Sequence, residues 1–368
     1  MGNRFPYMLN RAFAVQIANI SAALAIALGG LLGGTAGAGA DINTSLTNPK
    51  HFFYGIGTPS SAGAAANDLI YHGGNVGTEN PIGVERTPSV YLVWWGPQWA
   101  TGFTTPDTDA NHTLHSSTEL QTYLQSFFSD EGGTAWAGVQ TQYCRNLPAG
   151  VTSCNGYASA QFVTNPAGQL KGVWTDPSPV PSDIVTLGLA ENLVDDPIAA
   201  EARKAVKHFG YHANATYFVL TPDEVTGTGQ PVYCGYHTQT TSVDDLGNPY
   251  RFQYAFIPFQ NHDWGPPLGQ KSCGMHFVNP TTDAFGHGIW DGYSIVDGHE
   301  YAEAVTDPDN YFSVQDGWND AQGSENGDKC AWMPETQNVN MGTHYYAVQA
   351  LWSNEAFDAG RDPCAVTR

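Results

Sequence analysis

Apolar residues follow two patterns along the chain, one typical of buried strands and the other of amphipathic helices. Short apolar runs bounded by turn residues predict three strands, at Val90–Trp95, Thr216–Leu220 and Tyr254–Phe259. Helical spacing of apolar residues predicts three helices, at Ser117–Phe128, Pro197–Phe209 and Tyr345–Phe357. Because strands and helices alternate, we expect an α/β fold in which a mixed sheet is flanked by helices.

The first forty residues have the three parts of a secretory signal peptide. Arg4 and Arg11 precede a mostly apolar stretch, Ala12–Leu32, and two overlapping A-x-A cleavage sites end at Ala40. Glycines interrupt the apolar stretch, which disfavours the alternative of a retained membrane anchor. Small polar residues then predict a flexible leader over residues 41–68, and residues 69–368 are expected to form a single secreted globular domain with long loops.

The chain is acidic but poor in charge, which excludes several classes of partner. Of its 368 residues only 13% are charged, against about a quarter in an average soluble protein, and the formal net charge is −21. Loss of residues 1–40 removes two arginines and no acid, leaving 12 basic and 35 acidic residues and a charge of −23. We therefore expect no nucleic-acid partner and no stable membrane association after signal cleavage, and we favour a monomer.

All six cysteines lie in the part of the chain that is expected to be secreted. An even number of cysteines in an exported chain indicates disulfides, although the sequence does not select one pairing. We expect nearest neighbours to pair, as Cys144–Cys154, Cys234–Cys273 and Cys330–Cys364. A cysteine-based metal site is the weaker alternative, because no C-x-x-C spacing occurs.

The stretch Ser294–Pro308 concentrates ionisable residues in a chain that has few of them. Its middle is helical by pattern, and Pro308 marks its end. His299 and Glu303 are four residues apart, so they share one helix face and can reach one ion, and Glu300 stands where H-E-x-x-H metalloproteases keep their general base. The motif predicts a zincin-like domain in which zinc activates a water molecule and Glu300 accepts its proton.

A catalytic zinc ion usually has three protein ligands, so a third is needed. Glu325 is the expected third ligand, with its neighbour Asp328 as the rival and with Asp307 and His287 as further alternatives. One histidine with two carboxylates also suits manganese or calcium, so zinc is the first of several divalent cations to consider. In the competing interpretation, the helix exposes its glutamates to solvent and binds nothing; the scarcity of charge elsewhere makes this less favoured.

Two more histidines follow cysteines, in Cys234-Gly-Tyr-His237 and Cys273-Gly-Met-His276. We interpret each as a residue that satisfies nearby backbone groups beside a disulfide, in preference to an extra ligand or a proton shuttle. The sequence contains no G-x-S-x-G or S-x-x-K nucleophile motif and no phosphate-binding glycine loop.

Several segments together resemble one family, the plant Exordium or phosphate-induced proteins and their bacterial relatives. The matching segments occur in the family's order over roughly residues 69–365: Tyr71–Gly74, Val90–Gly96, Thr216–Val225, Cys234–His237, Tyr254–Phe259 followed by Cys273, Thr306–Pro308, Glu325–Cys330 and Cys364. The resemblance implies export to the cell wall or extracellular space and, in plants, a role tied to growth without a settled biochemical activity. The plant pattern commonly lacks the His–Glu pair, whereas this chain has His299, Glu300 and Glu303, as metallopeptidase-like bacterial relatives do. It therefore resembles a branch that retains chemistry.

Three functions are consistent with these features. The first is a secreted metal-dependent hydrolase, a peptidase with a protein or peptide substrate, in which the strand Tyr254–Phe259 would receive the extended substrate by edge pairing. The second is a non-catalytic Exordium-like binding or signalling protein with at most a structural cation. The third and weakest is a carbohydrate-active enzyme that uses Glu300 with a second acid.

Overall fold

The computed structural model describes residues 50–56, 68–74, 83–188, 196–223, 233–261, 273–281, 287–308 and 317–368. These ranges belong to one unit, Thr44–Arg368. The signal peptide predicted for residues 1–40 lies outside the described residues, as does most of the leader predicted for residues 41–68.

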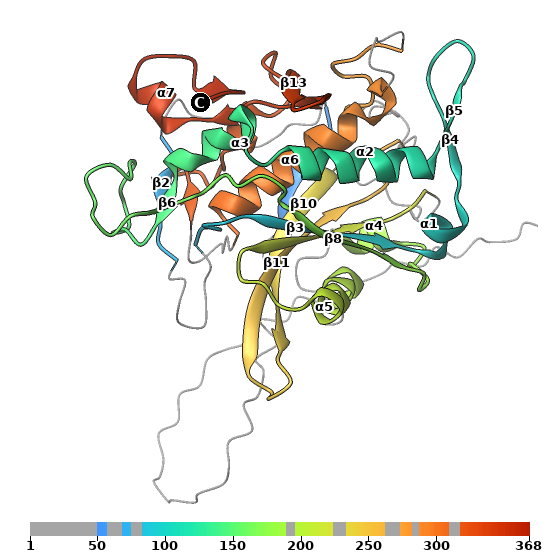
Figure 1. The fold of residues 1–368 in the computed structure, drawn as a ribbon, viewed down its shortest axis with the longest axis horizontal. Coiled ribbons are helices and arrows are strands. Elements are labelled where there is room, and N and C mark those ends of the chain that lie inside the picture. Colours follow the sequence, from blue (N-terminus) through green and yellow to red (C-terminus); the bar gives the residue numbers. More distant parts are fainter. Residues whose placement is uncertain are drawn as a thin grey trace, which may run out of the picture. The chain divides into compact units, whose positions relative to one another are not determined.

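A six-stranded mixed sheet forms the centre of the fold, with the strand order β1-β10-β11-β9-β3-β8 (Figure 1). Strands β11, β9, β3 and β8 pair in parallel, and β10 and β1 are added antiparallel at one side. The strands are β1 (His51–Tyr54), β3 (Ser89–Trp95), β8 (Leu170–Asp176), β9 (Ala215–Leu220), β10 (Tyr233–Val243) and β11 (Pro249–Ile257). The mixed α/β architecture expected from the sequence is therefore present.

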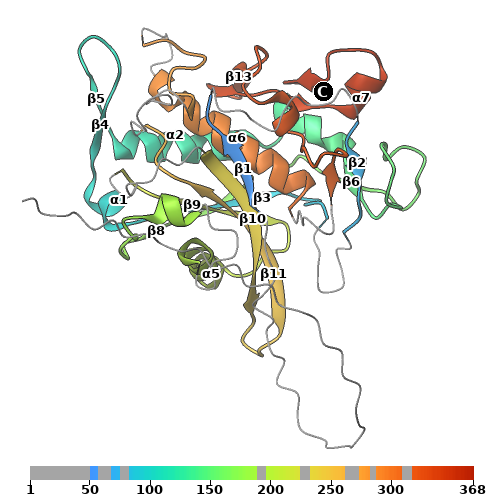
Figure 2. The same ribbon diagram turned by 180° about the vertical axis from the view of Figure 1, so that it is seen from behind.

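Helices cover both faces of this sheet, because successive side chains of a strand point to opposite faces. The even-numbered apolar residues of β3 pack with α2 (Ser117–Asp130) and α6 (Asp291–Thr306), whereas the odd-numbered ones pack with α5 (Pro197–Phe209). Figure 2 shows the same layers from behind, with α6 and α2 on one side of the sheet and α5 on the other. The site described below lies in the layer between the sheet and α6.

The remaining elements are short and surround this core. The helices are α1 (Pro97–Thr101), α3 (Ala135–Gly138), α4 (Ile184–Gly188) and α7 (Asn354–Asp358), with 3₁₀ turns at Val139–Gln142, Gly288–Trp290 and Asp328–Cys330. Five two-stranded ribbons pair β2 (Ile70–Tyr71) with β12 (Trp318–Asn319), β4 (Thr104–Pro106) with β5 (Leu114–Ser116), β6 (Cys144–Arg145) with β7 (Gln161–Phe162), β13 (Gln337–Met341) with β14 (His344–Val348), and β15 (Leu351–Trp352) with β16 (Cys364–Ala365). Among the described residues, no helix combines the length and the apolar character needed to cross a bilayer.

Two of the three predicted helices form close to their predicted bounds. Helix α2 begins one residue after Ser116, whose hydroxyl accepts a hydrogen bond from the backbone of Glu119, and α5 is capped by Asp196 in the same way. The third prediction, a helix over Tyr345–Phe357, is wrong. That segment contains β14, β15 and the short helix α7. Strands β13 and β14 form a hairpin whose two-residue turn begins with Gly342 at φ 83°, a conformation that glycine adopts without steric cost.

The prediction that Tyr254–Phe259 forms an edge strand is wrong. The strand Tyr254–Phe259, which was expected to offer an edge to a peptide, corresponds to β11, and β11 is paired on both sides. The edge strand nearest to β11 is β1. Strand β1 falls within residues 41–68, which were predicted to be a flexible leader, and it is part of the folded sheet. Any peptide that joins this side of the sheet must therefore meet β1 or β10.

Three disulfides join the cysteines in the predicted pairs, Cys144–Cys154, Cys234–Cys273 and Cys330–Cys364. No cysteine is free. Three disulfides fit a protein that folds in an oxidising, extracellular compartment.

Candidate metal centre

Helix α6 brings the predicted motif into the interior of the protein. All sixteen of its residues are buried, including His299, Glu300 and Glu303, which are at most 1% exposed. A helix with ionisable groups and no outward face is unusual, because a buried charge is costly unless another charge or a hydrogen bond compensates it. The interpretation in which these glutamates face solvent is therefore wrong.

Hydrogen bonds fix the tautomer of His299. Its Nδ1 lies 3.3 Å from Oε1 of Gln349, and the amide nitrogen of Gln349 donates to the carbonyl oxygen of Gly327 at 3.0 Å. Because the amide oxygen of Gln349 can only accept, Nδ1 of His299 carries the proton and Nε2 carries the lone pair. An outer hydrogen bond of this kind is what orients a metal-binding histidine.

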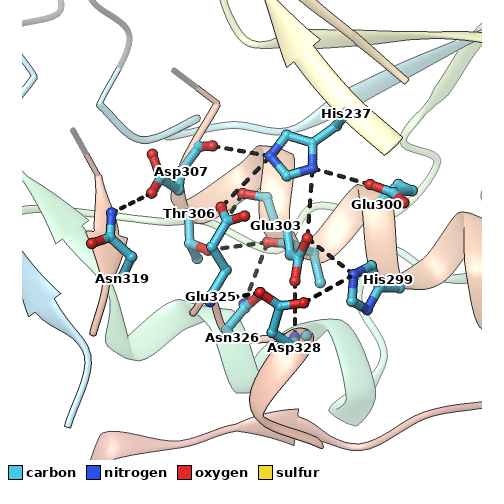
Figure 3. Close-up of polar contacts among 12 residues, drawn as sticks. His237, His299, Glu300, Glu303, Thr306, Asp307, Asn319, Glu325, Asn326 and Asp328 are labelled. Carbon is cyan, nitrogen blue, oxygen red and sulfur yellow. Dashed lines mark hydrogen bonds and ion pairs between the residues drawn. The ribbon is translucent and has the colours of Figure 1, made fainter. Parts of the chain in front are cut away.

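The lone pair of His299 points at a carboxylate. Nε2 of His299 is 3.0 Å from Oε2 of Glu303 and 4.0 Å from Oδ1 of Asp328, yet it makes no hydrogen bond with the described residues. Two acceptor atoms that face each other at 3.0 Å require a proton or a metal cation between them. His299, Glu303 and Asp328 thus form a group that could hold a metal ion (Figure 3).

A second group shares Glu303 and contains His237 and Glu325. His237 comes from β10, and its two ring nitrogens face oxygen atoms: Nδ1 is 3.0 Å from Oε2 of Glu300, and Nε2 is 3.3 Å from the carbonyl oxygen of Asp307. Both nitrogens therefore act as donors, so His237 behaves as an imidazolium that pairs with Glu300. Burial alone would lower the pKa of His237, but the carboxylates of Glu325 and Glu300 raise it well above its usual value.

Burial shifts the pKa values of Glu303 and His299 in opposite directions. Burial, reinforced by the nearby Asp328 and Glu325 carboxylates, raises the pKa of Glu303 well above its usual value. Burial lowers the pKa of His299, which keeps its ring neutral. Both shifts have one main cause, because burial disfavours the charged form of an acid and of a base alike.

The loop that carries Glu325 and Asp328 lies directly against the helix. The backbone N–H of Asp328 donates to Oε1 of Glu303 at 2.9 Å, which leaves Oε2 of that carboxylate facing His299. Gly327 permits this approach, because a Cβ atom there would lie 2.7 Å from Nδ1 of His299. The disulfide Cys330–Cys364 and the buried ion pair between Lys329 and Asp320, at 3.0 Å, anchor the same loop.

The structure separates the predicted ligands into two sets. Glu325 lies with His237 and Glu303, and its rival Asp328 lies with His299 and Glu303. The side chain of Asp307 is turned away, since its Oδ2 accepts a hydrogen bond of 2.6 Å from Asn319. His287 lies before the first turn of α6, about three turns from His299, and lines a separate cavity of about 690 Å³.

Of the two histidines that follow cysteines, one was interpreted correctly. His276 bonds to the carbonyl oxygen of Asn279 and to Asp107, as expected for a residue that satisfies its neighbours. His237 instead lies in the cluster and bonds to Glu300, so the expectation that it only satisfies nearby backbone groups was wrong. Its pairing with Glu300 spans 63 residues of sequence. The signal available in the sequence was a lone histidine within the otherwise uncharged segment Tyr233–Val243.

Scans of protein-family models and searches of curated proteins and solved structures find no match to this chain. The resemblance to the Exordium family therefore stays a prediction, and the site is interpreted from its own geometry.

Proposed function

We propose that this protein is a metal-dependent hydrolase with a zincin-like site, and that its substrate is a peptide. The observation that carries the proposal is the buried Nε2 of His299, which faces the carboxylate of Glu303 at 3.0 Å while Nδ1 lies against the amide oxygen of Gln349. His299, Glu303 and Asp328 would hold the ion. Zinc is the first expectation, and the two carboxylates also suit manganese or calcium.

A metal ion bound there supplies Lewis acidity, which polarises a substrate carbonyl and makes a water molecule more acidic. The protein's own contribution is a positioned base. Glu300 uses Oε2 to accept a hydrogen bond from His237, and its buried Oε1 has no hydrogen-bond partner among the described residues. That oxygen is available to accept a proton from water, and burial raises the pKa of Glu300 above its usual value, which makes its carboxylate a stronger base. In the overall reaction, water adds across the C–N bond of the peptide and yields a carboxylic acid and an amine.

His237 acts in this scheme as a positioning residue. Its Nδ1–H holds Glu300, and its Nε2–H is held by the backbone of Asp307. His237 lies on β10 three residues after Cys234, and the disulfide Cys234–Cys273 fixes this part of the strand. The dyad of His237 and Glu300 therefore has a defined orientation relative to His299.

A specific observation favours a second candidate, a secreted protein with a purely structural cation. The cluster is closed, since His237, His299, Glu300, Glu303 and Glu325 are all at most 1% exposed. Only the side chain of Asp328, at 23%, is partly accessible. A structural ion needs no access, whereas a hydrolase does.

Metal analysis combined with turnover separates the two candidates. The purified protein should contain one divalent ion per chain and should hydrolyse an unstructured protein in a chelator-sensitive reaction. Glu300→Gln should keep the ion and lower turnover about 10²–10⁴-fold, as expected for loss of a general base. His299→Ala should lose both the ion and turnover.

Glu131→Gln is the matched control, because Glu131 is also a fully buried glutamate but lies outside both metal-binding groups. This variant should keep both the ion and turnover. A wild-type protein without metal, or a Glu300→Gln variant with normal turnover, would overturn the proposal. Bound metal without hydrolysis would favour the structural cation.

A further inference from the structure

Strand β1 covers the candidate metal centre. The ring of Phe53 stacks on the ring of His299, with centroids 3.8 Å apart and planes 17° from parallel. On its other face Phe53 stacks on Trp332, with centroids 4.9 Å apart. Phe53 therefore closes one face of the imidazole of His299.

The backbone of β1 is bound as an added peptide would be. It runs antiparallel to β10, with Phe53 opposite Gly235 and His51 opposite His237, so its register places it beside the cluster. The indole N–H of Trp332 donates to the carbonyl oxygen of Tyr54 at 2.8 Å. Figure 2 shows β1 alongside β10 and close to α6.

The residue opposite Phe53 on β10 is a glycine with little space around it. A Cβ atom at Gly235 would lie 3.0 Å from Oε1 of Glu300 and 2.9 Å from Val296. The bare backbone of β10 thus lies next to the proposed base, and the side chain that fills the space above His299 comes from the neighbouring strand.

Hydrolysis at a site this closed requires some element to leave, and β1 has fewer strand partners than the central strands of the sheet. It is a four-residue strand at the end of the sheet and pairs with β10 alone, whereas β10 and β11 pair on both sides. Short edge elements open at lower free energy than central ones.

We propose that the edge of β10 is the substrate-binding strand of the proposed hydrolase. It would bind an extended peptide antiparallel to β10, with an aromatic side chain stacked on His299, and β1 holds this place until it is displaced. This inference rests on the proposed function for its chemistry, but the binding of a peptide to β10 can be measured without metal or turnover.

The test uses the full chain with a specific protease site introduced between residues 57 and 66, so that β1 can be severed after folding. A labelled peptide with the sequence of residues 50–56 should bind the cut chain and not the uncut chain. The same peptide with Ala in place of Phe53 should bind about tenfold more weakly, because aromatic stacking is lost. Hydrolysis of an unstructured protein should rise on cutting.

The outcomes distinguish this inference from the proposed function. A cut chain that has released its N-terminal segment but does not bind the peptide overturns the inference. In a protein that does hydrolyse the substrate, an equal rate before and after cutting also overturns it. A cut chain that binds the peptide but holds no metal and hydrolyses nothing overturns the proposed function and leaves the peptide-binding strand in place.

A second pair of variants works in the uncut chain, in case severed protein unfolds. Phe52 and Phe53 are neighbours on opposite faces of β1, and Phe52 packs against Tyr233 and Tyr236 instead of His299. Phe53→Ala should expose His299 to a histidine-modifying reagent, measured by mass spectrometry, whereas Phe52→Ala should not. Equal modification of His299 in wild type and in both variants would overturn the inference.

Discussion

The hydrogen bond between Gln349 and His299 gives the sharpest test of the metal centre. Gln349→Leu keeps a side chain of similar size but removes the acceptor for Nδ1 of His299 and the donor to the carbonyl oxygen of Gly327. Without that acceptor, the proton of His299 is free to move to Nε2, which would block the proposed ligand atom.

The structure allows the size of the effect to be worked out. Loss of an outer hydrogen bond of a metal-binding histidine typically costs about 10–100-fold in affinity, which corresponds to about 1.4–2.8 kcal/mol. In addition, two buried polar groups lose partners, at about 1–3 kcal/mol each in the free energy of unfolding. We therefore expect weaker metal binding together with lower stability.

A competition assay with a chromophoric chelator measures the affinity, and urea unfolding measures the stability. Gln142→Leu is the matched control, because Gln142 is also a buried glutamine that donates to Val139 and Ser353, but it lies outside both candidate metal-binding groups. It should lose stability and keep the metal affinity. If Gln349→Leu binds metal as tightly as wild type while both variants lose similar stability, the assignment of the His299 tautomer is wrong.

Three further predictions concern the loop, the glycine beside the site and a buried acid. Replacing Cys330 and Cys364 by serine opens a loop of 34 residues, which should lower the free energy of unfolding in urea by about 4 kcal/mol and weaken metal binding. Opening Cys144–Cys154 should lower it by about 3 kcal/mol and leave metal binding unchanged. Gly327→Ala should displace His299 and abolish metal binding by elemental analysis while circular dichroism stays native; retained metal would contradict the close packing of this loop. Burial raises the pKa of Glu85 from its usual value near 4.5 to about 8, so the folded state binds this proton more tightly than the unfolded state does. The folded state therefore loses stability as pH rises from 4.5 to 8, by at most about 1.4 kcal/mol per pH unit. Glu85→Gln should lose less stability than wild type between pH 5 and pH 8 in urea unfolding, and an identical loss in both proteins would contradict the assignment.

The elements predicted correctly are those whose signals are local. Helix α2 has a serine cap and a one-sided apolar pattern, and β3 is a continuous apolar run that ends at Gly96-Pro97. The helical pairing of His299 with Glu303 is also local, because side chains four residues apart always share a helix face. The disulfides followed nearest-neighbour order, which the sequence suggested but did not require.

The missed features depend on contacts between distant parts of the chain. Gln349 attracted no attention in the sequence, since a lone glutamine becomes an orienting residue only when folding brings it to His299, 50 positions away. His237 was misjudged for the same reason. The prediction of a helix at Tyr345–Phe357 followed apolar spacing and overlooked the turn at Gly342-Thr343, which starts a hairpin.

The complete burial of α6 has a consequence for how the sequence can vary. An ordinary surface helix tolerates substitution on its outward face, so its tolerance rises and falls every three or four residues. All sixteen positions of α6 face other parts of the protein, and they include Asp297, whose pKa burial raises well above its usual value. A mutational scan should therefore find residues 291–306 to be one uninterrupted intolerant block, in contrast to the periodic tolerance expected along α2, which has exposed positions.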